Sequence, residues 1–298
     1  MSFRAVSAPM SNAVSTKPFF LRLGEFIRFS HTIFALPFGM IAMLVAGNGR
    51  VPLSVLGWIL VCMVSARTGA MCFNRLSDWE IDKENPRTAK RHTLLGKSNA
   101  WVICALSLAV SIFAAWKLNP LCFYLSPVMI VLITFYSLTK RFTAYSHFFL
   151  GLALSVAPMG AWAAVRGELW SLTPYFLAAA VVCWVFGFDL IYSTLDADFD
   201  RKKGLYSFPS RFGVAAALKL AKGLHIVAAV GFFVFGWLAG LGRFYWVAWL
   251  IVVGALVWEH RIADPENPGS INEAFFNINA LVSMTLLAGV LLNYFVAA

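Results

Sequence analysis

Long apolar runs alternate with short polar connections along the whole chain, and nine of the runs are about long enough to cross a bilayer as helices. A helix needs about 20 mainly apolar residues to span the hydrocarbon core. Turns containing Gly, Pro or Asn separate several of the runs. This pattern predicts an all-α integral membrane protein with nine transmembrane helices. The runs cover residues 31–47, 53–73, 99–118, 121–138, 145–165, 173–194, 214–240, 244–259 and 274–296.

The composition agrees with that fold class. The 298 residues are 60% hydrophobic and 13% charged, whereas soluble domains are about half apolar and about a quarter charged. The five cysteines lie in or beside apolar runs without the paired spacing of a metal site, so they are interpreted as small apolar residues. Residues 1–18 lack an apolar core and predict a mobile N-terminal tail, not a cleaved signal. Residues 19–298 are expected to form one membrane domain.

The basic residues are concentrated in every second connection between the runs. The connections after the even-numbered runs hold thirteen Lys and Arg, and those after the odd-numbered runs hold four. Because positively charged loops stay inside, this asymmetry places the N-terminus and the even-numbered connections in the cytoplasm, as in a protein of the cell inner (plasma) membrane. The net charge of +10 then favours lipid headgroups of the bilayer and an anionic substrate as partners, with no nucleic acid.

Two polar segments interrupt the apolar pattern, and together they hold eight of the fourteen acidic residues. The first, 74–96, reads NRLSDWEIDKENPRTAKRHTLLG, and the second, 189–204, reads DLIYSTLDADFDRKKG. Both lie beside connections that the charge asymmetry assigns to the cytoplasm. We therefore expect the helices to bring the two segments together around a central cavity that opens to the cytoplasmic side.

Within each segment, polar residues recur at helical spacing. One set stands at i, i+4 and i+8 and the other at i, i+3, i+7 and i+11, so each set shares one face of an α-helix. Stacked carboxylates repel one another and destabilise a helix unless a cation binds between them. Oxygen ligands without His or Cys favour Mg²⁺ shared with substrate phosphates; the alternative is two solvated helix ends. The sets are Asn74, Asp78 and Asp82, and Asp189, Tyr192, Asp196 and Asp200.

The two segments resemble a known family. NRLSDWEID is similar to the N-x-x-x-D-x-x-x-D motif of the UbiA superfamily of intramembrane prenyltransferases, and DLIYSTLDADFD to its second motif, Y-x-x-x-D-x-x-x-D. NPRTAKR and GLYSFPSRFG also resemble the family, and the likeness runs over residues 20–296. HTIFALPF and NEAFFNINALVS resemble one subgroup, the futalosine-pathway prenyltransferases of menaquinone synthesis, which are often labelled 4-hydroxybenzoate polyprenyltransferase-like. The superfamily fold has nine helices, as the apolar runs also predict.

The resemblance implies a site for Mg²⁺ and diphosphate. Its metal ligands would be Asn74, Asp78, Asp82, Asp196 and Asp200, and the four aspartates would be the catalytic residues. Cations and hydroxyls beside these ligands would hold the diphosphate and stabilise its charge as the C–O bond breaks. The alternative interpretation is that these charged residues only form a solvated surface. The candidates are Arg87, Lys90, Arg91, Tyr136, Lys140, Tyr192 and Lys202.

Ionisable residues inside the apolar runs are candidates for binding the second substrate. An ionisable group at that depth costs about 2.5–3.5 kcal/mol, so it normally faces a polar cavity unless it snorkels to the helix end. Arg67 is our first candidate for the carboxylate of an aromatic acid, and Arg28 is the second. His31 is a candidate contact to the acid unless it is structural, and Asp189 is a candidate for the cavity wall and for the base.

The function that the resemblance implies is Mg²⁺-dependent transfer of a polyprenyl chain from its diphosphate to an aromatic acid. An electron-rich ring carbon attacks the allylic cation, which carboxylates and aromatic faces stabilise. The acceptor would be 4-hydroxybenzoate in ubiquinone synthesis or a dihydroxynaphthoate in menaquinone synthesis, and the sequence leaves both open, together with other UbiA-type acceptors. Two other classes are a cation-coupled transporter, whose sites lie near the midplane, and a phosphatidyl-alcohol transferase, whose D-G-x-x-A-R string is absent.

Overall fold

The computed structural model of the protein describes residues 17–296, so residues 1–16 of the predicted tail lie outside the described part of the chain. Within 17–296 the regular elements are all helices, and there is no strand. Eight helical segments are long and apolar enough to cross a membrane, which is the pattern of a multi-pass membrane protein. The predicted run 244–259 is also helical, as α12 (Arg243–Ile262), but it is not one of the eight. Nine spans therefore stay a prediction.

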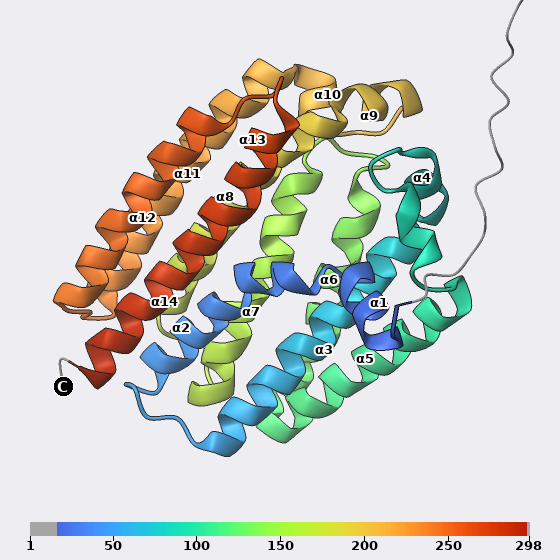
Figure 1. Cartoon of the computed structure of the whole chain (residues 1–298). Helices are drawn as coiled ribbons and strands as arrows, with labels where there is room; N and C mark the ends of the chain where they lie inside the picture. The colour runs from blue at the N-terminus through green and yellow to red at the C-terminus, as the bar shows by residue number, and fades with distance from the viewer. Residues whose placement is uncertain (1–16, 297–298) are drawn as a thin grey trace, which may run out of the picture.

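The long helices lie side by side in one bundle (Figure 1). The closest neighbours are α3 with α5, α8 with α11, α7 with α8, and α12 with α14, while α2 packs on α7 and α14. Their bounds are α2 Leu36–Ala46, α3 Leu53–Ser77, α5 Lys97–Leu118, α6 Pro120–Thr139, α7 Ser146–Arg166, α8 Thr173–Ser193, α11 Val214–Leu238, α12 Arg243–Ile262 and α14 Asn279–Phe295.

Short helices connect the long ones, and α4, α9 and α10 gather at one end of the bundle (Figure 1). The polar segments predicted from the sequence fall on these connections and on the adjoining ends of α3 and α8. The short elements are α1 Phe19–Phe26, η1 Phe29–Phe34, α4 Trp79–Glu84, η2 Ala89–Thr93, η3 Thr194–Asp196, α9 Ala197–Lys203, α10 Phe208–Phe212, α13 Pro268–Glu273 and the π-helix η4 Ala274–Ile278.

Aromatic side chains fill the core between α2, α8 and α11. Phe38 stacks on Phe232 with ring centroids 5.5 Å apart, and Trp184 packs on Phe38 and Phe188. All four rings are buried. This aromatic core holds α8 in the middle of the bundle, so the polar segment at the end of α8 is fixed relative to α2 and α11.

The expectation that each polar stripe lies on one continuous helix is wrong in detail. Helix α3 ends at Ser77, Asp78 follows it with φ −94° and ψ 11°, and α4 then begins at Trp79. Asp82 is therefore carried by a different helix from Asn74. The 3₁₀ turn η3 likewise separates α8 from α9. The breaks let carboxylates along each stripe face different cations instead of one another.

We expect the contact between α7 and α8 to depend on Gly151. A Cβ atom at Gly151 would lie 2.7 Å from the carbonyl oxygen of Val182, so Gly151→Ala must push the two helices apart. Gly160 on the same helix has nothing within 4 Å of that position, and alanine there favours the helix by about 0.5–1 kcal/mol. Thermal unfolding in detergent should show a lower melting temperature for Gly151→Ala and an unchanged or higher one for Gly160→Ala. Equal melting temperatures would contradict this account.

Candidate active site

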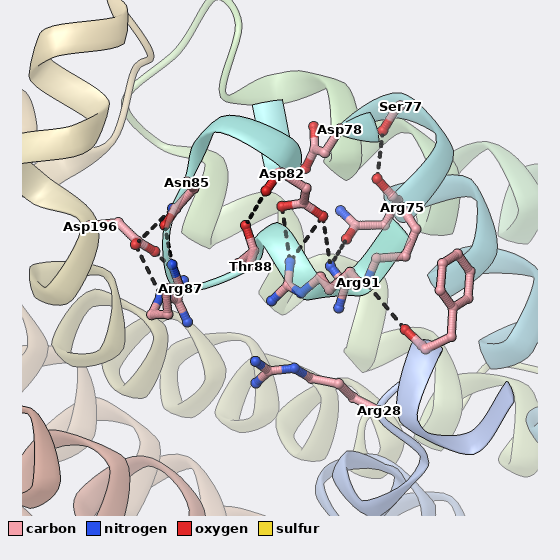
Figure 2. Close-up of polar contacts among 12 residues, drawn as sticks. Arg28, Arg75, Ser77, Asp78, Asp82, Asn85, Arg87, Thr88, Arg91 and Asp196 are labelled. Carbon is pink, nitrogen blue, oxygen red and sulfur yellow. Dashed lines mark hydrogen bonds and ion pairs between the residues drawn. The ribbon is translucent and has the colours of Figure 1, made fainter. Parts of the chain in front are cut away.

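The two polar segments meet at the carboxylate of Asp196. Arg87 donates from Nε to Oδ1 at 3.0 Å and also pairs through Nη2 with Oδ2. Asn85 donates from Nδ2 to Oδ1 at 3.2 Å, as Figure 2 shows. Arg87 and Asn85 follow α4, whereas Asp196 ends the turn η3, so these bonds join segments more than a hundred residues apart. The predicted convergence of the two segments is therefore present in the fold.

Tyr192 extends this contact into the bundle. Its hydroxyl accepts a hydrogen bond from Arg87 Nη1 at 2.6 Å and one from Arg28 Nη1 at 3.3 Å. The Arg87 guanidinium also lies over the Tyr192 ring, 5.0 Å from its centroid. Burial lowers the pKa of Arg87, but Tyr192 and Asp196 raise it above its ordinary value. Asp200 is half-buried one helical turn further along α9.

Asp82 is held by two arginines. Arg91 donates from Nη1 to both carboxylate oxygens, at 3.0 and 3.1 Å, and Arg75 Nη1 lies 3.8 Å from Oδ2. Arg75 is buried and also donates to Asn74 Oδ1 at 3.1 Å. Burial lowers the pKa of Arg91 below its ordinary value, Asp82 opposes this, and the like charge of Arg28 adds to it. Arg28 and Arg91 are thus close enough to repel each other, which indicates a strongly positive site.

Asp78 is almost fully buried, with 4% of its surface exposed, and it faces cations from the end of α6. Lys140 Nζ lies 2.6 Å from Oδ2, and Arg141 Nη2 lies 3.3 Å from Oδ1. The Lys140 carbonyl accepts a hydrogen bond from the backbone N–H of Tyr206 at 2.8 Å, which ties this corner to the chain after α9. Charged groups at this depth are stable only when paired, so Asp78 fixes the end of α6 to the end of α3.

The network contains more positive than negative side chains. Arg28 points into the space beside Arg87 and Arg91 (Figure 2), and no carboxylate of residues 17–296 forms an ion pair with it. Six cationic side chains surround four acidic ones, and a surplus of this kind at a half-buried site favours an anionic ligand with several oxygens. The cations are Arg28, Arg75, Arg87, Arg91, Lys140 and Arg141, and the acids are Asp78, Asp82, Asp196 and Asp200.

An apolar cavity of about 390 Å³ lies among α2, α3, α5, α6 and α7. Arg67, Thr32 and Tyr136 line it, and most of its remaining wall is aliphatic. Arg67 donates from Nε to Thr32 Oγ1 at 3.1 Å and from Nη2 to the Arg28 carbonyl at 3.2 Å. No carboxylate of residues 17–296 forms an ion pair with Arg67. A guanidinium in an apolar cavity without a counter-ion is suited to bind an anionic group.

The other predicted residues lie in different surroundings. The His31 ring packs among Phe34, Phe275 and Phe276, with centroids 5.3–5.6 Å away. Asp189 does not line the apolar cavity; its Oδ2 lies 2.6 Å from Nδ1 of His147. The exposed ammonium groups of Lys90 and Lys202 form no hydrogen bond or ion pair with the described part of the chain. The fold thus does not bring these two lysines into the network.

Three residues that contact predicted site residues carry no signal of their own in the sequence. Asn85 precedes a proline and resembles an ordinary turn residue. Arg75 stands between Asn74 and a leucine, and His147 lies near the start of an apolar run. Each has a partner that is distant in sequence: Asn85 lies 111 residues from Asp196, Arg75 lies 49 residues from Phe26, and His147 lies 42 residues from Asp189. The spacing of polar residues within one segment cannot show such partners.

The predicted metal ligands fit a divalent cation in chemistry but are not arranged as a preformed cage. Carboxylate and amide oxygens are what Mg²⁺ prefers. Over residues 17–296, however, no three acidic, His or Cys side chains cluster as a metal site. Asp78, Asp82 and Asp196 each face Lys or Arg instead. The donor set can hold the ion only when those pairs open.

The fold and the site together define a multi-pass helical protein with a cation-rich, carboxylate-containing polar site and an apolar cavity within the bundle. A family model described as the UbiA prenyltransferase family matches residues 35–281. The chain belongs to this family and is a prenyltransferase, in agreement with the resemblance of its motifs.

Individual proteins show the same relationship. The chain is 31% identical over 260 residues to 4-hydroxybenzoate octaprenyltransferase of Shewanella amazonensis, covering 84% of this chain and 87% of that one. It is similar to the apo structure of a UbiA homolog from Aeropyrum pernix, with 31% identity, a TM-score of 0.80 and coverage of 88% and 97%. A UbiA homolog from Archaeoglobus fulgidus bound to DMAPP and Mg²⁺ shares the fold, at 18% identity, a TM-score of 0.65 and coverage of 90% and 99%.

Proposed function

We propose that the protein transfers a polyprenyl chain from polyprenyl diphosphate to an aromatic acid, with 4-hydroxybenzoate as the first candidate acceptor. The observation that carries this proposal is the cation-rich network of Arg28, Arg87 and Arg91 together with Arg67, which lines an apolar cavity and has no counter-ion among residues 17–296. One set of cations suits a diphosphate, and the other suits a carboxylate next to an apolar tail. The name of the relative from Shewanella amazonensis supports this choice of acceptor.

The diphosphate would lie against Arg28, Arg87, Arg91 and Lys140, with the Tyr192 hydroxyl beside it. Lys90 and Lys202, exposed at the rim, would attract the anion before it binds. Tyr136 would lie between this site and the cavity that it lines. Strong anion binding needs several fixed cations of this kind, because each charge-assisted hydrogen bond is stronger than a neutral one.

Mg²⁺ would be held by the oxygens of Asn74, Asp78, Asp82, Asp196 and Asp200, and when bound it would neutralise charge on the leaving diphosphate. The Archaeoglobus fulgidus homolog bound to DMAPP and Mg²⁺ supports a divalent cation in this fold. Diphosphate oxygens compete with Asp196 for the Arg87 guanidinium, so binding of the substrate releases that carboxylate as an oxygen ligand. Arg91 and Asp82 form a second pair of the same kind.

The cavity would hold the prenyl tail and keep water from the allylic cation. Arg67 would bind the carboxylate of the acceptor, and the aromatic surroundings of His31 would pack against its ring. The C–O bond of the diphosphate breaks, a C–C bond forms ortho to the phenol hydroxyl, and the ring loses one proton. Asp189, which lies outside the apolar cavity and contacts His147, is our candidate for accepting that proton.

We place the enzyme in the cell inner membrane with its polar site on the cytoplasmic side. The positively charged connections support this orientation, and both substrates in the proposal are anions that those connections would attract. Residues 19–298 would act as one domain. A dihydroxynaphthoate acceptor, and with it a role in menaquinone synthesis, is the second candidate because HTIFALPF and NEAFFNINALVS resemble that subgroup.

Purified protein with labelled polyprenyl diphosphate, Mg²⁺ and a panel of aromatic acids tests the proposal. We expect diphosphate release and a prenylated acid with 4-hydroxybenzoate, and the panel includes a dihydroxynaphthoate to separate the two acceptors. Asp78→Ala and Asp196→Ala should each abolish turnover without unfolding the protein, whereas Asp198→Ala, at an 85% exposed side chain, should remain active. Release of no diphosphate with any acceptor would reject the proposed reaction.

We expect Arg67 to act on the acceptor and not on the diphosphate. Arg67→Gln keeps a hydrogen-bond donor but removes the charge, and a hydrogen bond to a charged group contributes about 1.5–3 kcal/mol. The KM for the aromatic acid should therefore rise about ten- to a hundredfold, while the KM for polyprenyl diphosphate stays near that of the wild type. Steady-state kinetics with each substrate varied in turn measures both. A rise confined to the diphosphate KM would remove Arg67 from the acceptor site.

A further inference from the structure

A second polar cluster lies buried between α8, α11, α12 and α14, and the proposed reaction uses none of it. His225 is 2% exposed, and Glu259 and Asn279 are 0% exposed. His260 closes the cluster, with its ring centroid 4.9 Å from that of His225. Polar groups in such surroundings are strongly destabilising unless each donor and acceptor finds a partner. The pattern of partners therefore reveals where the protons are.

The tautomer of His225 follows from its contacts. Its Nε2 lies 3.2 Å from the Trp184 carbonyl, which can only accept, so Nε2 carries a hydrogen. In the neutral ring Nδ1 is then an acceptor, and His260 Nε2 lies 3.0 Å from it. A Cβ at Gly187 would collide with the His225 ring, so this glycine lets the ring reach α8. His225 in this form offers no hydrogen to Glu259.

One of the two carboxylate oxygens of Glu259 then has no hydrogen-bond donor within residues 17–296. Its Oε1 accepts a hydrogen bond from Asn279 Nδ2 at 2.8 Å. Its Oε2 is buried and accepts no hydrogen bond within residues 17–296, and Asn279 Oδ1 is in the same position. Nδ1 of the neutral His225 ring lies 3.4 Å from Oε2 but has no hydrogen to donate, and no Lys or Arg of the described chain pairs with Glu259. Two acceptors are therefore unsatisfied on side chains that already share one hydrogen bond.

One proton removes both defects. Placed on Glu259 Oε2, it turns that oxygen into a donor, and Asn279 Oδ1 is the acceptor on the side chain already bound to Oε1. We infer that Glu259 is an un-ionised carboxylic acid paired with the Asn279 amide, and that this pair is a positioning device for the diphosphate site. The second part of the inference rests on the proposed function.

The positioning acts through the π-helix η4. Asn279 Nδ2 also donates to the carbonyls of Ala274 and Phe275, at 3.1 and 3.2 Å, so it stabilises this turn of wider helix. The Phe275 ring stacks on Tyr192 with centroids 4.0 Å apart and an interplanar angle of 24°. Tyr192 in turn accepts the hydrogen bond from Arg87. The acid–amide pair thus fixes the turn that presents Phe275 to Tyr192.

Matched substitutions at Glu259 test the inference. Gln has the shape of the un-ionised acid and can donate from its amide to Asn279 Oδ1, whereas Leu has neither donor nor acceptor. We expect Glu259→Gln to keep the wild-type melting temperature and KM for polyprenyl diphosphate within about twofold. Glu259→Leu should lower the melting temperature and raise that KM about tenfold. A Gln variant as impaired as the Leu variant would show that the carboxylate is ionised and overturn the inference.

Infrared spectroscopy gives a readout that does not depend on catalysis. Wild-type protein should show the carbonyl stretch of a buried un-ionised carboxylic acid, and Glu259→Gln should remove it. Absence of that band in the wild type would show that Glu259 and His225 form an ion pair instead. If the wild type transfers no prenyl chain to any acid, the proposed function fails, but the infrared band and the melting temperatures still decide the state of Glu259.

Phe275→Leu tests the coupling separately, because it removes the ring stack and leaves Glu259 and Asn279 in place. The infrared band should persist while the KM for polyprenyl diphosphate, or the dissociation constant of inorganic diphosphate, rises about tenfold. An unchanged diphosphate affinity in this variant would mean that the acid–amide pair serves only the packing of α12 and α14, and the positioning role would be overturned.

Discussion

The pairing of Arg87 with Asp196 is the interaction on which the polar end of the bundle depends. Helices in a membrane gain little from burying apolar surface against one another, so specific polar contacts and close packing decide how their ends meet. Arg87 and Asn85 reach Asp196 across the bundle, and Lys140 reaches Asp78 from a third helix. The Lys and Arg side chains that hold these helix ends together are the same groups that suit a diphosphate. The packing of the polar end and the binding of the substrate therefore depend on the same charges.

The buried polar residues outside this network follow one rule. Each is either hydrogen-bonded to a partner within the protein or is suited to bind a ligand that supplies the partner. Glu259 and Asn279 satisfy each other when Glu259 carries one proton, and no Lys or Arg of the described chain pairs with Glu259. Arg67 lies at an apolar cavity with donors to Thr32 and a backbone carbonyl but no counter-ion among residues 17–296. The first arrangement is complete and stabilises a π-helix, whereas the second is completed by an anion.

The sequence predicts the helices and the joining of the two segments because both leave local signals. Apolar runs mark the spans, and Asn74, Asp78 and Asp82 repeat at helical spacing. It does not predict that α3 ends before Asp78, since nothing at Ser77 resembles a helix stop. Partners such as Asn85 and Glu259 were also missed, because their roles arise from contacts that only the packed bundle creates. Long-range contacts, not local preference, decide which charge faces which.

Competition between Arg87 and a divalent cation for Asp196 tests the central claim most directly. Calorimetric titration with Mg²⁺, with and without inorganic diphosphate, compares the wild type with Arg87→Gln and with Lys203→Gln, which removes an equal charge from an exposed pair with Glu84. We predict that Arg87→Gln binds Mg²⁺ alone about tenfold more tightly than the wild type. Inorganic diphosphate should raise the Mg²⁺ affinity of this variant much less than it raises that of the wild type. Lys203→Gln should behave as the wild type in both titrations. Unchanged or weaker binding of Mg²⁺ alone by Arg87→Gln would contradict the central claim.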